Sequence, residues 1–230
     1  TPGSKMVNYD PFSISTDLLY DFVNLFDDEE PNEKSTIDKN QLNANIVDFA
    51  SKRGFLGSGQ KDRLQDWHLE IFSLRKLIVC MQAIKSGDTK SIREFVSWTP
   101  EQIRFQWVVG DLRSSSWIAH KSDFKTDLFK GLHWKDYQSA ATLHIQNQIN
   151  QRLETDTRYF LRNHIDNPQN LVPTLAPTTL RGAIWINFMR EFTGKRNPKT
   201  CEYSGCYNLH TKRGKFSRKP PKRAGRLETR

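Results

Sequence analysis

Positive charge is concentrated at one end of this 230-residue chain, and that distribution constrains its folding more than any other feature. From Lys195 to Arg230 there are twelve Lys or Arg and two Glu, a net charge of +10. The remaining 23 basic and 24 acidic residues give the preceding part a net charge of −1. The basic segment is also rich in Gly and Pro, so it cannot form a hydrophobic core of its own. The fold must be built before Lys195.

The composition favours a packed body and no membrane partner. Hydrophobic residues make up 36% of the chain, with six Trp and fourteen Phe. No stretch approaches the roughly 20 apolar residues that cross a bilayer. The chain has three cysteines, an odd number, and they lack the pattern of a disulfide framework. This cysteine usage suits a reducing compartment. We therefore expect a cytoplasmic protein.

The spacing of apolar residues predicts a mainly helical body over residues 6–167, with residues 1–5 outside the fold. Capping residues and glycines mark helices over about 18–26, 38–53 and 64–86, and a short helix after Asp88. A longer, weakly amphipathic helix is expected over 135–161. Pro168, Pro173 and Pro177 predict an extended connector over 168–177. A last helix over 178–194 leads to the basic arm, residues 195–230.

Between residues 103 and 119 the apolar period changes from helical to alternating. Ile103, Phe105, Trp107 and Val109 alternate with polar residues, and Trp117 follows a turn region. This pattern predicts a hairpin or a sheet of two to three strands. The expected fold class is mainly α with a small antiparallel β element (α+β). Trp107 and Trp117 are candidates for an exposed stacking or partner surface.

The glycine-rich segment Gly54 to Gly59 resembles a phosphate-binding loop only superficially. It lacks the Lys-Ser/Thr of a P-loop, and no strand pattern precedes it. We expect a plain connector.

Cys201 and Cys206 lie five residues apart across a Gly-containing turn, the arrangement of a zinc knuckle. A structural zinc site takes four nitrogen or sulfur ligands in a tetrahedron. The chain supplies Cys201, Cys206 and His210, which is an incomplete set. Zinc is therefore a candidate cofactor, and a pair of reduced thiols is the alternative.

The segment Leu175 to Phe188, the Cys201-x4-Cys206 pair and Lys212-Arg213-Gly214 together resemble the C-terminal region of uncharacterised prokaryotic proteins that end in a CGNR-type, treble-clef-like zinc finger. The resemblance covers about residues 175–230. In that family a second cysteine pair opens the closing helix, and no second pair is present before Arg230. The resemblance thus implies a degenerate or truncated zinc-finger-like appendage on a prokaryotic protein.

The basic arm is suited to contacts with nucleic acid phosphates. We predict a non-enzymatic DNA- or RNA-binding protein, or a subunit of a prokaryotic nucleic-acid-handling complex. Two alternatives stay open for the arm: it binds an acidic protein or an acidic membrane surface, or it has no partner. The expected phosphate-contacting residues are Lys195, Arg196, Lys199, Lys212, Arg213, Lys215, Arg218, Lys219, Lys222, Arg223 and Arg226.

Two other classes of function stay open. A protein-interaction module, such as an antitoxin, inhibitor or adaptor, would use the acidic segment Asp27 to Glu30 and exposed aromatic residues. A ribonuclease similar to the HEPN family would use an Arg-x4–6-His pattern, which occurs at Arg63/His68, Arg113/His120 and Arg158/His164. Three occurrences in one chain make this pattern weak.

Overall fold

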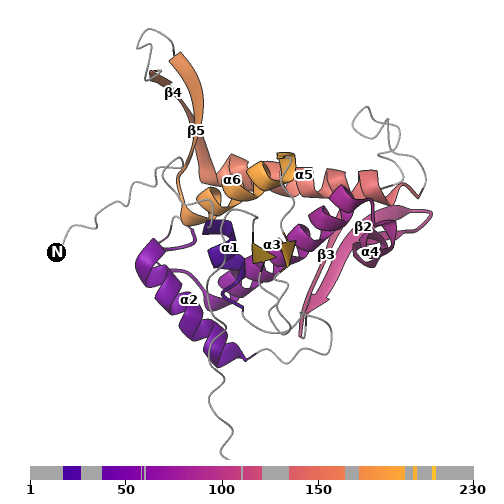
Figure 1. Ribbon diagram of the computed structural model, residues 1–230, viewed down its shortest axis with the longest axis horizontal. Helices are drawn as coiled ribbons and strands as arrows, with labels where there is room; N and C mark the ends of the chain where they lie inside the picture. Colours follow the sequence, from indigo (N-terminus) through magenta and orange to yellow (C-terminus); the bar gives the residue numbers. More distant parts are fainter. Residues whose placement is uncertain are drawn as a thin grey trace, which may run out of the picture.

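The computed structural model describes residues 18–26, 38–57, 59, 61–109, 111–120, 135–163, 171–194, 199–200 and 209–210. Within them the chain forms six helices and three small antiparallel sheets (Figure 1). The helices are α1 (Leu18–Val23), α2 (Lys39–Arg53), α3 (Leu64–Ser86), α4 (Thr89–Phe95), α5 (Tyr137–Asp156) and α6 (Leu180–Thr193). The strands are β1 (Val96–Trp98), β2 (Gln102–Val109), β3 (Leu112–His120), β4 (Thr157–Asn163), β5 (Leu171–Pro177), β6 (Lys199–Thr200) and β7 (Leu209–His210). The predicted α+β class is confirmed.

Helix α3 is the central element of the body. Eleven of its 23 residues are buried, so it contacts other elements on more than one side. Gly87 ends the helix in the left-handed conformation, with φ of 72°, which glycine adopts without the strain of a side chain. Arg75 is buried as well, and its Nη1 donates to the carbonyl oxygens of Val23 and Phe26. These hydrogen bonds join α3 to the last residue of α1 and to the turn that follows it.

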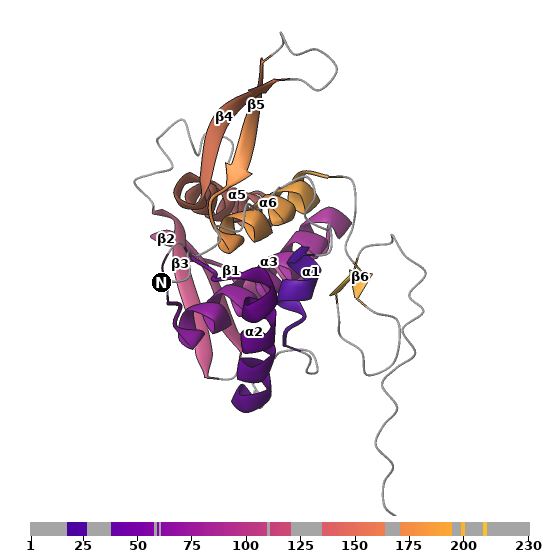
Figure 2. The same cartoon turned by 90° about the vertical axis from the view of Figure 1, so that its left-hand side faces the viewer.

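The first two helices lie on one side of α3 (Figures 1 and 2). Their contact is an aromatic cluster in which Phe22 of α1 lies 5.9 Å from Phe49 of α2 and 5.8 Å from Trp67 of α3, measured between ring centroids. The side chain of Asp38 accepts hydrogen bonds from the amides of Asn40 and Gln41, which caps α2 as predicted.

Strands β1, β2 and β3 form one antiparallel sheet in sequence order, and its inner face packs on α4 and α5. The alternating residues of β2, from Ile103 to Val109, supply that inner face and are buried. Phe105 at its centre stacks on Phe95 of α4 and on His144 of α5, with centroid distances of 5.7 and 4.0 Å. Burial lowers the pKa of His144 to about 4, so its ring is neutral at pH 7 and acts as a core residue.

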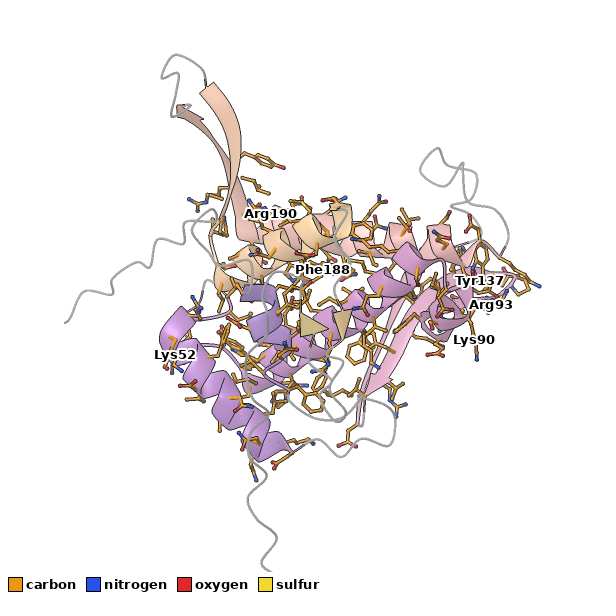
Figure 3. The ribbon with its side chains drawn as sticks, viewed as in Figure 1. Lys52, Lys90, Arg93, Tyr137, Phe188 and Arg190 are labelled. Carbon is orange, nitrogen blue, oxygen red and sulfur yellow. The ribbon has the colours of Figure 1, made fainter. Side chains whose placement is uncertain are left out.

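Helices α5 and α6 lie side by side across α3. Figure 3 shows Phe188 of α6 on the side facing α3 and Arg190 on the outer side. A Cβ atom added to Gly182, in the first turn of α6, would lie 2.2 Å from the carbonyl oxygen of Asp156. Only glycine therefore allows the start of α6 to approach the end of α5 this closely.

Strands β4 and β5 form a two-stranded ribbon that projects from the body between α5 and α6 (Figures 1 and 2). The predicted helix over 135–161 is wrong after Asp156, where the chain enters β4. Residues 171–177 of the segment expected as an extended connector are extended and form β5, paired in register from Thr157 opposite Pro177 to Asn163 opposite Leu171. The prolines fit because this ribbon has only two strands, so each strand has an edge that needs no hydrogen bonds.

In the part of the chain that the structure describes, none of the helices has both the length and the apolar character needed to cross a membrane.

Candidate nucleic-acid interface

The point at which the basic arm leaves the body is fixed by Lys85. Its Nζ donates to the carbonyl oxygens of Glu191 and Gly194, at 2.6 and 2.9 Å, and so holds the C-terminal end of α6 against α3. A lysine there also complements the negative end of the helix dipole. Burial lowers the pKa of Lys85, and the nearby Glu191 acts in the opposite direction.

Most of the predicted phosphate-contacting residues fall outside the described residues. Lys199 is the exception and belongs to β6, where its backbone is paired opposite His210 of β7. The others are Lys195, Arg196, Lys212, Arg213, Lys215, Arg218, Lys219, Lys222, Arg223 and Arg226.

The strands β6 and β7 enclose the segment that carries both cysteines of the predicted zinc site. Thr200 is paired with Leu209, and Lys199 is paired with His210. Thr200 directly precedes Cys201 in the chain, so the pairing brings the backbone before Cys201 next to the backbone at Leu209 and His210. Cys201 and Cys206 lie outside the described residues. Within the described residues no group of three or more His, Cys, Asp or Glu side chains is arranged to hold a metal ion. The zinc site stays a prediction.

The outer face of the β1–β3 sheet carries an exposed tryptophan. Trp117 of β3 is 61% exposed, although it has two ring contacts. The guanidinium of Arg104, its cross-strand neighbour on β2, lies 5.1 Å from the ring centroid. The imidazole of His120 stacks beside it with a centroid distance of 5.9 Å and an interplanar angle of 26°. Trp117 is thus held in place yet open to solvent.

Apart from Trp117 and Val108, the same face carries cationic and polar side chains. Beyond Trp117 and Arg104, the cross-strand pairs on this face are Gln106 with Ser115 and Val108 with Arg113. No Asp or Glu occurs in β1, β2 or β3. The acidic residues next to these strands lie in turns, and one of them, Asp111, is paired with Lys39 of α2 at 3.3 Å.

The two tryptophans singled out on this hairpin have opposite positions. Trp107 is only 6% exposed and belongs to the core, so that half of the prediction is wrong, whereas Trp117 is exposed as expected. Trp107 is in phase with Ile103, Phe105 and Val109, and this parity was the signal that it faces inward. Sequence reasoning missed Arg104 and His120, whose side chains contact the ring of Trp117.

The glycine-rich loop after α2 is a connector, as predicted. The amides of Leu56 and Gly57 donate to the carboxylate of Asp62, which also accepts a hydrogen bond from Trp67 Nε1 at 3.1 Å. The carbonyl oxygen of Leu56 accepts from the amide of Arg181. These amides are occupied by an internal carboxylate and therefore do not form a phosphate cradle.

A buried cluster of charged side chains joins α3, α5 and α6. Glu70 accepts a hydrogen bond from Trp185 Nε1 at 2.5 Å, and its other oxygen lies 3.1 Å from Nη2 of Arg152. Burial raises the pKa of Glu70, and the charge of Arg152 acts in the opposite direction.

The second half of this cluster surrounds Asp156. Its carboxylate accepts two hydrogen bonds from Arg181, at 2.7 and 3.1 Å, and one from the hydroxyl of Thr179. The hydrogen bond to Asp156 raises the pKa of Arg181. Both buried carboxylates are paired with partly exposed arginines, and these pairs link the helices to one another.

The three Arg-x4–6-His pairs lie on different elements. Arg63 precedes α3, and His68 within that helix is hydrogen-bonded to Asn43 of α2 at 2.8 Å. Arg113 and His120 both belong to β3. Arg158 belongs to β4, and its partner His164 lies outside the described residues, as does the acidic segment Asp27 to Glu30.

Comparison of the chain with protein-family models, with curated proteins and with solved structures finds no match. The resemblance to the CGNR-type proteins stays a prediction from the residues quoted for it.

Proposed function

We propose that this protein binds nucleic acid without catalysing a reaction on it, and that the basic arm, residues 195–230, supplies the phosphate contacts. The observation that supports the proposal is the division of charge, +10 on the arm against −1 on the rest of the chain. A cationic segment gains affinity for a polyanion mainly by releasing condensed counterions. The body anchors the arm through α6 and Lys85.

The test is a salt titration of binding to labelled duplex and single-stranded oligonucleotides. The logarithm of the association constant is expected to fall linearly with the logarithm of salt concentration, by about 0.9 per phosphate neutralised on duplex DNA and about 0.7 on a single strand. A chain ending at Gly194 is expected to lose this binding. Unchanged affinity after that truncation would overturn the proposal.

A matched set of charge variants separates the arm from general surface charge. Lys212→Gln, Arg213→Gln and Lys215→Gln together remove three charges from the arm and are expected to lower the slope on duplex DNA by about 2 to 3. The control removes three exposed lysines of the body: Lys52→Gln, Lys61→Gln and Lys90→Gln. Figure 3 shows Lys52 and Lys90 at opposite ends of the molecule. Equal effects of the two sets would contradict a specific role of the arm.

A protein partner is the second candidate, and the projecting ribbon favours it. Tyr159 at the base of β4 is 81% exposed, and an isolated two-stranded ribbon is only marginally stable in water. A partner that packs on the ribbon would stabilise it. A protein that co-purifies through nuclease treatment and high salt, and is lost with Tyr159→Ala, would support this candidate; purification of the chain alone after both treatments would count against it.

A further inference from the structure

We propose that the outer face of the β1–β3 sheet is a second binding surface, on which Trp117 stacks against an unpaired base of a single-stranded nucleic acid. The inference rests on the proposed function for the phosphate contacts of the arm and adds a surface of the folded body. It assigns the class of ligand: a single strand, bound through its bases as well as its phosphates.

The geometry of Trp117 suits stacking. Aromatic rings of this size normally bury most of their area in the core, and Trp117 leaves 61% of its surface in solvent. Its ring is nevertheless oriented by Arg104 at 5.1 Å and by His120 at 5.9 Å. Because neighbours on a strand hold the ring, little side-chain entropy is lost when a base stacks on it.

The charges around Trp117 define what kind of strand fits. Arg104 and Arg113 occupy the outer face in line with the tryptophan, and the three strands contain no acidic residue. An anionic backbone can therefore run along the face while a base contacts the ring. The planar guanidinium of Arg104 offers a further stacking surface, and Gln106 and Ser115 offer hydrogen bonds.

The surface favours unpaired bases over a duplex. In a duplex the faces of the bases are covered by their neighbours, so a tryptophan on a sheet cannot reach them without unstacking. In a single strand every base has an accessible face, and sheets that bind such strands use exposed aromatic side chains in this way.

The experiment compares the full-length chain on two probes of equal length and charge, a 20-nucleotide oligothymidine and its abasic analogue. Binding is measured by fluorescence anisotropy at one salt concentration, together with a 20-nucleotide oligouridine to distinguish DNA from RNA. The variants are Trp117→Ala, Trp117→Phe and the control Phe55→Ala, which removes an aromatic ring of similar exposure outside the sheet.

The wild-type chain is expected to prefer oligothymidine or oligouridine over the abasic strand. Trp117→Ala is expected to weaken binding to the base-containing strand about 5- to 100-fold, with no change on the abasic strand. Trp117→Phe is expected to retain part of the preference, and Phe55→Ala all of it.

Two results would overturn the inference. One is equal affinity of the wild-type chain for base-containing and abasic strands, a measurement that does not depend on any variant. The other is a Trp117→Ala chain that keeps the full preference for base-containing over abasic strands. This result would overturn the inference even if the same change removed a protein partner. Failure of the proposed function gives a different result from failure of this inference. If the arm does not supply the phosphate contacts, the abasic strand binds the chain ending at Gly194 as tightly as the full chain.

Discussion

At the scale of single residues, Glu70 links burial to pH dependence. Burial raises its pKa above the ordinary value of about 4.5, so the folded state holds this proton at a higher pH than the unfolded state does. The free energy of unfolding therefore falls as the pH rises through the window between 4.5 and the raised pKa. Glu70→Gln removes this dependence, so the stability of the wild type relative to the variant is expected to decrease from acidic to neutral pH.

Urea unfolding of both chains at several pH values between 4 and 8 measures that difference. Glu154→Gln, an exposed residue of α5, is the control for loss of one negative charge. The same pH trend in both variants would contradict the assignment to Glu70.

Glu70→Ala also removes the acceptor of the buried Trp185 N–H. It is expected to lower the free energy of unfolding by about 2–4 kcal/mol at pH 7, measured by the same urea unfolding.

Gly182 allows the backbone of α6 to approach the end of α5 closely. In Gly182→Ala the added methyl group would meet the carbonyl oxygen of Asp156 at 2.2 Å, so the helices must separate. The expected loss is about 1–3 kcal/mol in the free energy of unfolding, measured by urea denaturation. The control is Gly57→Ala, whose Cβ would meet Asp62 Oδ1 at an ordinary 3.7 Å. A smaller loss for Gly182→Ala than for Gly57→Ala would refute the steric explanation.

At the scale of elements, the ribbon of β4 and β5 is an insertion between two packed helices. Its base is closed by the amide of Thr178, which donates to the carbonyl oxygen of Asp156 at 2.8 Å, and by the pairing of Thr157 with Pro177. Replacing residues 158–176 by Asn-Gly, a favoured two-residue hairpin turn, is therefore expected to leave the body folded, within about 1 kcal/mol of the wild type. Thermal and urea unfolding test this; loss of a cooperative transition would show that the ribbon belongs to the core.

The ribbon also marks where sequence reasoning stops. Caps such as Asp38 and Asp88 and stops such as Gly87 are local signals, and the helices that they bound were predicted well. No local signal ends α5 at Asp156. The chain turns there because Asp156 binds Arg181 and Thr179, which lie 25 and 23 residues further on. A helix boundary set by a distant partner is not visible in a local pattern.

Of the candidate interface, the sequence predicts which residues of β2 face the core but not which residues of β3 lie opposite them. The alternation in β2 gives a clear parity, and it correctly assigns Ile103, Phe105 and Val109 to the core. Strand β3 offers three consecutive serines before Trp117, so its parity cannot be read, and the register shifts between Ile103 and Arg104. The pairing of Trp117 with Arg104 follows from that register and needed the structure.

At the scale of the whole molecule, the arm is expected to contribute little to the stability of the body. Among the residues whose burial the structure describes, the core residues all precede Gly194, and the carbonyl that Lys85 binds at Gly194 remains in a chain ending there. Strand β7 of the arm contacts α1, and this contact is lost in the shorter chain. In the absence of nucleic acid, the truncated and full-length chains are expected to unfold at the same temperature within about 2 °C. Calorimetry at high salt measures this without the effect of the arm's charge. A large drop in the unfolding temperature would show that the contact of β7 with α1 supports the fold of the body.

Coupling between ligand binding and unfolding then distinguishes an arm that acts alone from an arm that acts with the sheet. A ligand stabilises a fold only as far as it prefers the folded state. The arm carries its charges whether or not the body is folded, so contacts made by the arm alone leave the unfolding temperature unchanged. Stacking on Trp117 requires the sheet, because Arg104 and His120 orient the ring only in the folded state.

Saturating oligothymidine is therefore expected to stabilise the full-length chain by about 1–3 kcal/mol, the contribution of one stacked base. The abasic strand is expected to give no shift, and Trp117→Ala is expected to abolish the shift with oligothymidine while the arm still binds. Thermal unfolding followed by circular dichroism, with binding checked by anisotropy below the transition, measures both quantities. Equal shifts with the two strands would assign the stabilisation to phosphate contacts and remove the sheet from the interface.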